Sequence, residues 1–167
     1  MIYDCVEQAY AVLNTNFATD YSALLTAKSV ASPGTVKLVK RQKVTTALRY
    51  GLQAPLIGVI SLAARTQAKD QGKRDTQALL AYDIYITGAA SSDGAALVAK
   101  QIEIAAEAAM RSVDKLAASG LGVFGAGELP LTVDITLSDD EEEEVQEGKY
   151  GRRATVSFQV WDRDEGV

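Results

Sequence analysis

The chain has 167 residues, of which 47% are hydrophobic and 23% charged, so it can bury the core of one folded domain. It has no histidine and a single cysteine, Cys5, which excludes a Ser-His-Asp triad and an internal disulfide. Its net charge is −5, and no apolar run reaches the roughly 18 residues that a membrane-spanning helix needs. We therefore expect one domain over residues 1–167 that is not an enzyme and has no membrane partner.

The first predicted element is a helix over residues 2–17, where apolar residues recur at steps of three and four, as on one face of a helix. Residues 18–54 follow without a sustained period, and Ser32-Pro33-Gly34 marks a turn within them. We interpret this stretch as a long basic connecting arm with one short strand near residues 36–39. Connections of this length are unusual in compact domains, so the arm is a candidate for a functional segment.

Two strands with a polar connection are expected next, as a hairpin. Residues 56–62 are apolar at almost every position, which is typical of a largely buried strand. Residues 77–87 alternate, and one face of this second strand carries Leu80, Tyr82, Ile84 and Ile86. Asp83 and Tyr85 fall on its other face, where we expect them to face solvent or an interface.

The clearest helix is predicted over residues 93–118, with an apolar stripe made of Val98, Ile102, Ala105, Ala109, Val113 and Leu116. Two strands follow, at 129–137 and 153–161, and each alternates between an apolar and a polar face. The order is therefore helix, two strands, helix, two strands. It predicts an α+β fold in which a four-stranded, mainly antiparallel sheet carries two helices on one face.

Charge is divided unevenly along the chain. No acidic residue occurs from Tyr21 to Lys69, where eight basic residues give +8, so the rest of the chain carries −5 − 8 = −13. Seven acidic residues lie between Asp139 and Glu147, in a predicted acidic loop over residues 139–149. Oppositely charged segments of this kind can meet across subunits or at a partner. The predicted interface residues are Lys37, Lys40, Arg41, Lys43, Arg49, Asp139, Asp140, Glu141, Glu142, Glu143 and Glu144.

Other chemistries fit these motifs less well. The basic stretch 37–49 can neutralise a nucleic-acid backbone, but Tyr50 is its one neighbouring aromatic residue and helix-turn-helix spacing is missing. The acidic run lacks the spaced ligands and turn glycine of a calcium loop. Residues 120–125 have the spacing G-x-G-x-x-G, but they follow a helix and precede a strand, the reverse of a dinucleotide fingerprint. We predict no catalytic residue, no cofactor and no metal.

The order of elements and several local sequences resemble the tail-terminator (tail completion) proteins of long-tailed bacteriophages. Pro55-Leu56-Ile57-Gly58-Val59 looks like that family's entry to the first strand. Residues 80–86 look like its second strand, which a long alanine-rich helix follows, and residues 153–160 look like its last strand. The arm at 18–54 departs from the short connection that is usual in the family.

The resemblance covers residues 1–17 and 55–162 and implies a structural virion protein. Proteins of this family form rings, commonly hexamers, that end the tail tube and join the tail to the head. The implied partners are further copies of the chain, the tail tube protein and head–tail connector proteins, and the genome passes through the lumen without tight binding. The implied location is the tail or neck of the virion, and the host cytoplasm during assembly.

Two alternatives remain. The first is another phage neck or baseplate component built on a similar fold. The second is a ferredoxin-like ligand-binding or enzymatic α+β domain, which needs polar groups that converge in a pocket. Its candidate groups are Asp83, Tyr85 and Asp134.

Overall fold

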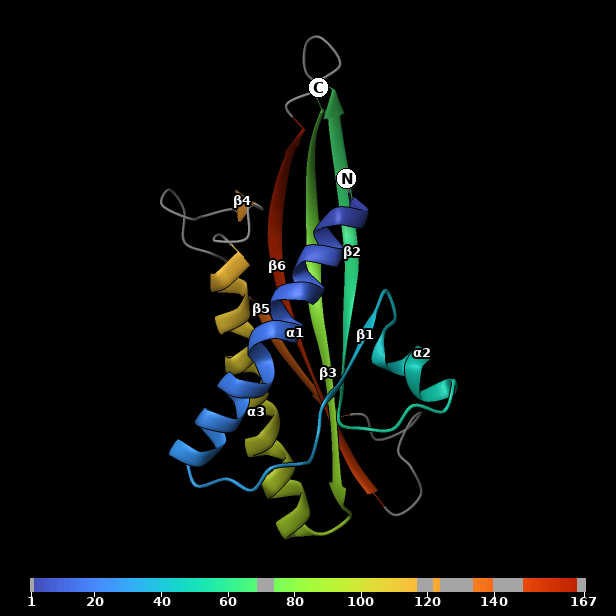
Figure 1. Cartoon of the computed structure of the whole chain (residues 1–167). Coiled ribbons are helices and arrows are strands. Elements are labelled where there is room, and N and C mark those ends of the chain that lie inside the picture. Colours follow the sequence, from blue (N-terminus) through green and yellow to red (C-terminus); the bar gives the residue numbers. More distant parts are fainter. Residues whose placement is uncertain (1, 69–73, 117–121, 124–133, 140–148, 165–167) are drawn as a thin grey trace.

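The computed structural model describes residues 2–68, 74–116, 122–123, 134–139 and 149–164 (Figure 1). Two long helices, α1 (Ile2–Ala27) and α3 (Ser92–Leu116), pack against each other on one face of a β-sheet. The predicted α+β class and the order of its main elements are confirmed. None of the helices in the described ranges combines the length and the apolar character that a bilayer span requires.

Within the described residues the sheet has six strands: β1 (Lys37–Lys40), β2 (Leu56–Ala68), β3 (Arg74–Ala89), β4 (Gly122–Val123), β5 (Asp134–Asp139) and β6 (Lys149–Asp164). Their order is β1-β2-β3-β6, and both β4 and β5 pair with the far edge of β6. Only β1 and β2 run parallel. The four predicted strands are β2, β3, β5 and β6, and the predicted strand residues 129–133 lie outside the described ranges.

The β2–β3 hairpin is longer than its apolar sequence indicates. Pairing continues through polar residues as far as Ala68 opposite Arg74, so most of the polar connection belongs to the strands. This is possible because ladder hydrogen bonds join backbone groups and do not depend on apolar side chains. A shift of register between Ser61 and Ala63 leaves Leu62 as the extra residue of a β-bulge, and its side chain is 45% exposed.

The core lies between the sheet and the two long helices. Tyr82 of β3 donates a hydrogen bond to the Ala9 carbonyl of α1 at 2.9 Å, and Tyr21 of α1 donates to the Gln101 carbonyl of α3 at 3.0 Å. These two buried hydroxyls join the three elements, and burial raises the pKa of both phenols well above the ordinary value. The predicted apolar stripe of α3 is confirmed, because all its members are buried: Val98, Ile102, Ala105, Ala109, Val113 and Leu116.

The predicted arm at 18–54 is much shorter in the structure. Helix α1 continues ten residues beyond the predicted end, to Ala27, because Tyr21, Leu24 and Leu25 extend its buried stripe. After a connection, β1 adds a parallel strand at the sheet edge, and a short helix, α2 (Val44–Arg49), follows. We refer to residues 41–54 as the α2 segment.

The α2 segment lies on the face of the sheet opposite α1 and α3 (Figure 1). Val44 and Ala47 pack there in a small cluster of their own with Leu56 of β2 and Tyr85 of β3. The segment approaches the sheet so closely that a Cβ atom at Gly58 would collide with the Gln42 carbonyl oxygen. The middle of the sheet is therefore covered on both faces.

Candidate functional site

The five basic residues of the predicted interface lie on β1 and the α2 segment. Lys37 and Lys40 begin and end β1, Arg41 and Lys43 lead into α2, and Arg49 ends that helix. All five side chains are exposed. The structure therefore places the basic stretch along one edge of the sheet and across the second face.

Two of these cations are already paired inside the subunit. Lys40 Nζ lies 3.0 Å from Glu7 Oε2, and Arg41 Nη2 lies 2.6 Å from Glu7 Oε1. Hydrogen bonds from Lys40 and then Arg41 hold the pKa of Glu7 below its ordinary value. Lys40 Nζ also lies 4.6 Å from the centre of the Tyr10 ring, a cation–π contact. These contacts tie the end of β1 to α1, so Lys40 and Arg41 have a role within the subunit that the sequence did not indicate.

The remaining basic residues differ from Lys40 and Arg41 in their ion pairing. In the described part of the chain, no acidic side chain forms an ion pair with Lys37, Lys43 or Arg49. Tyr50, next to Arg49, is 79% exposed. We call Lys37, Lys43, Arg49 and Tyr50 the basic surface. It consists of three exposed cations and one large, exposed aromatic ring.

The acidic half of the predicted interface is placed only at its start. Asp139 ends β5, and its backbone pairs in register with Arg152 of β6. The other predicted acidic residues, Asp140, Glu141, Glu142, Glu143 and Glu144, lie outside the described residues.

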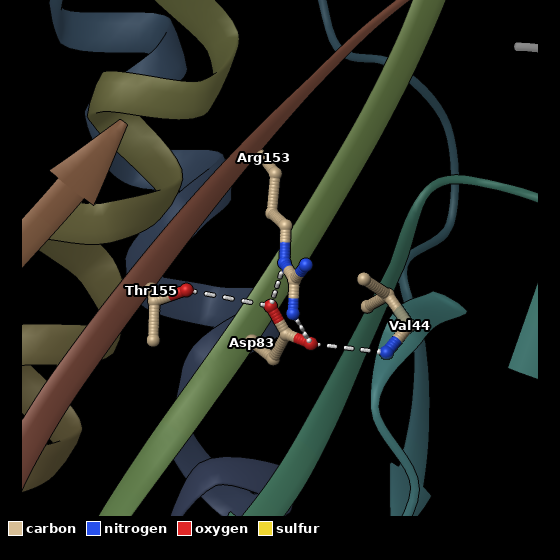
Figure 2. A network of polar contacts seen from close by, with 4 residues as sticks. All are labelled: Val44, Asp83, Arg153 and Thr155. Carbon is tan, nitrogen blue, oxygen red and sulfur yellow. Dashed lines mark hydrogen bonds and ion pairs between the residues drawn. The ribbon is translucent and has the colours of Figure 1, made fainter. Parts of the chain in front are cut away.

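A buried polar network lies beneath the α2 segment (Figure 2). Asp83 is completely buried, and its Oδ1 accepts a hydrogen bond from Arg153 Nε at 2.6 Å. Its Oδ2 accepts from Arg153 Nη2 at 2.8 Å and from the Val44 backbone N–H at 3.0 Å. Thr155 Oγ1 makes a longer contact of 3.5 Å with Oδ1. The carboxylate thus joins three parts of the fold: β3, β6 and the start of α2.

The prediction that Asp83 and Tyr85 face solvent or an interface is wrong. Both side chains are 0% exposed, because the α2 segment covers the face of β3 on which they lie. A buried carboxylate is costly unless it is paired and hydrogen-bonded, and the two parallel bonds from Arg153 meet that requirement. Two features of the sequence indicated this network. Asp83 lies inside the otherwise apolar run 79–86, and Arg153 and Thr155 occupy alternate positions of the last predicted strand.

Asp83 also caps α2 from a distant part of the chain. The N-cap residue, Lys43, makes no side-chain capping hydrogen bond. The first backbone N–H groups of a helix have no partner within it, and a carboxylate is a favourable acceptor for them. Asp83 accepts the hydrogen bond from Val44, the first residue of α2. The start of α2 is therefore fixed to the sheet by a residue 39 positions away in sequence.

A groove of about 640 Å³ runs between α1 and residues 30–38. Its lining includes buried apolar side chains of α1, among them Leu13, Phe17, Tyr21 and Leu25, and it contains no charged residue. Asp83 and Tyr85, which the ligand-binding alternative requires in a pocket, do not line it. Within the described ranges, no group of three or more His, Cys, Asp or Glu residues is placed to hold a metal ion.

Comparison with known proteins finds no matching family model and no curated protein that matches significantly.

Proposed function

We propose that the chain is a non-catalytic assembly subunit that binds further copies of itself head to tail. The observation that carries the proposal is the basic surface, whose three cations have no acidic partner among the described residues. The same chain carries seven acidic residues between Asp139 and Glu147. Two different, complementary surfaces on one chain are what a heterologous interface requires, and such interfaces form rings when the rotation between neighbouring copies closes.

The assembly we propose is the ring that ends the tail tube of a long-tailed bacteriophage and joins the tail to the head. The support is the element order of the resemblance described above, with which α1-β2-β3-α3-β5-β6 agrees. The partners are then further copies, the tail tube protein and head–tail connector proteins, in the tail or neck of the virion. The genome would pass through such a ring, and the overall charge of −5 per chain disfavours tight binding of duplex DNA.

The charges of this interface steer encounter and fix its register. Exposed ion pairs contribute only about 0–1 kcal/mol each, so Lys43 and Arg49 do not hold a ring together alone. Tyr50 supplies apolar contact area beside them, and tyrosine is one of the residues that dominate binding energy at interfaces. In the interface we propose, the two cations Lys43 and Arg49 therefore steer the encounter, and the Tyr50 ring supplies apolar contact.

Sedimentation velocity and electron microscopy of the purified chain test the proposal. We expect concentration-dependent assembly and ring-shaped particles. The double variant Lys43→Glu, Arg49→Glu should assemble more slowly and with less sensitivity to salt. The matched control is Lys100→Glu, Arg111→Glu on α3, which makes the same change in net charge on an exposed helix face. A monomer at every concentration and salt, or equal effects of both double variants, would count against the proposal.

The groove beside α1 favours a second candidate function, the binding of an apolar ligand. Its volume of about 640 Å³ is typical of small-molecule sites, and its floor is apolar and aromatic. Phe17 and Tyr21 stack there with ring centres 5.1 Å apart. A saturable rise in melting temperature with an apolar small molecule, abolished by Ala18→Trp at the groove, would favour this function over assembly.

A further inference from the structure

The α2 segment is attached to the sheet by a small apolar cluster that is separate from the main core. Its fully buried side chains are Val44 and Ala47, and Leu48, Leu52 and Ala54 are partly buried against them. Segments with few buried apolar contacts open locally at a lower free energy than the rest of the fold. The polar contact at the start of α2 is therefore a large part of what fixes the segment in place.

That polar contact depends on one carboxylate. Asp83 binds the Val44 N–H, and Arg153 holds Asp83 through two hydrogen bonds of 2.6 and 2.8 Å. The side chain of Arg153 is 23% exposed, whereas that of Asp83 is 0% exposed. Arg153 can therefore turn to solvent when its partner is lost, whereas the Val44 N–H is held in this network by Asp83.

Three of the four residues of the basic surface, Lys43, Arg49 and Tyr50, are close to this contact in the chain. Lys43 immediately precedes Val44, and Arg49 and Tyr50 lie at the other end of α2. Since α2 has six residues, at 1.5 Å per residue both ends lie within about 10 Å of each other. Any displacement of Val44 therefore displaces the side chains that would meet a partner.

We propose that Asp83 is a positioning residue for an interaction surface formed by Lys43, Arg49 and Tyr50, whose occupant is the acidic run of a second copy of this chain. The choice of occupant follows from charge complementarity, since the surface is basic and residues 139–147 carry seven carboxylates. The inference rests on the proposed function and adds the residue that organises its interface. Asp83 touches no partner itself and acts through Val44.

The first test measures attachment of the segment in the folded subunit. In Asp83→Asn, trypsin should cleave after Arg41, Lys43 and Arg49 about tenfold faster than in the parent, while cleavage after Lys100 in α3 keeps its rate. Thr155→Val is the matched control, because it removes only the 3.5 Å contact and should leave cleavage unchanged. Equal cleavage in Asp83→Asn and the parent would overturn the inference.

A second variant displaces the segment without touching the ion pair. Gly58→Ala places a Cβ against the Gln42 carbonyl and should give the same selective cleavage at 41–49. If Asp83→Asn does not fold, Gly58→Ala still tests whether the α2 segment opens separately from the core. Uniform acceleration of cleavage throughout Gly58→Ala, including Lys100, would show that the segment and the core open together, and would overturn the inference.

The third test measures the surface itself with a fluorescent synthetic peptide of residues 138–149. At low salt, Asp83→Asn and Gly58→Ala should bind the peptide about fivefold or more weakly than the parent, while Thr155→Val binds it equally. Equal binding by the parent and Asp83→Asn overturns only the positioning role. A parent that binds no peptide and forms no assembly overturns the proposed function as well. Stronger, Asp83-dependent binding of a short DNA duplex would overturn the acidic segment as occupant.

Discussion

On the face that α1 and α3 cover, the sheet is held by a continuous apolar cluster with contributions from both helices and from β2, β3 and β6. On the opposite face, four buried residues and the Asp83–Arg153 pair hold the α2 segment. Apolar contacts are non-directional and add up over a large area, whereas a buried ion pair acts at one point and depends on its geometry. We therefore expect the two faces to unfold differently. The first should open only when the whole domain unfolds, whereas the second can open locally.

This difference matches the roles that we assign to the faces. Surfaces that bind partners or rearrange are drawn from the less stable parts of a fold, because they must adjust without unfolding the domain. Lys43, Arg49 and Tyr50 of the basic surface lie on the α2 segment, and the polar network attaches this segment to the sheet. The helix-covered face supplies the rigid base.

The largest expected effect comes from a charge on the helix-covered face. Ile102 of α3 is 0% exposed, and Ile102→Asp buries an unpaired carboxylate among apolar side chains. Such burial costs several kcal/mol, which is comparable with the total stability of about 5–15 kcal/mol of a small domain. We expect the variant to lose its cooperative thermal transition in circular dichroism. Leu97→Asp, at a 38% exposed position of the same helix, is the control and should melt like the parent.

A smaller effect is expected when the same substitution, valine to alanine, is made separately on each face. Val113→Ala in α3 should lower global stability by about 1.5–3 kcal/mol, because it removes two buried methyl groups at about 0.8 kcal/mol each and leaves a cavity. Val44→Ala removes the same atoms from the second face, so we expect a smaller change in melting temperature and faster hydrogen exchange at 44–49. Equal falls in melting temperature, with no selective exchange, would show that the two faces unfold as one unit.

The helix-covered face could be read from the sequence because its signal is periodic. The stripe from Val98 to Leu116 keeps a helical step over 19 residues, and the alternating strands 77–87 and 153–161 keep a step of two. The continuation of α1 was missed although Tyr21, Leu24 and Leu25 keep the helical step after Phe17. That stretch was predicted to be part of a charged arm because basic residues are frequent between positions 28 and 49.

The second face could not be read in the same way. A helix of six residues is too short to show a period, and burial of Asp83 follows only once the α2 segment is known to cover it. The exposure of Lys37, Lys43 and Arg49 was predictable from their charge. The pairing of Lys40 and Arg41 with Glu7 was not, because it depends on where β1 lies beside α1.

The smallest expected effect concerns Glu7, where the two regions meet at the sheet edge. Glu7 has a lower pKa in the folded chain than its ordinary value of 4.5, because Lys40 and Arg41 donate hydrogen bonds to its charged form. Below 4.5 the unfolded chain therefore binds this proton more readily than the folded chain does. The stabilisation by Glu7 is fully present above that pH and is lost as the pH falls through the lower, folded value.

We therefore expect Glu7→Gln to melt slightly below the parent at pH 7, with a difference that shrinks at a second pH below 4.5. Differential scanning calorimetry at the two pH values measures this difference. Because the pair is exposed, the effect should shrink as salt is added, unlike the effects of Ile102→Asp and Val113→Ala on the buried face. Glu103→Gln, on an exposed position of α3, is the control and should match the parent at both pH values. A difference for Glu7→Gln that does not shrink as the pH falls below 4.5 would mean that the glutamate stabilises the fold by packing, and that the sheet edge resembles the apolar face more than the polar one.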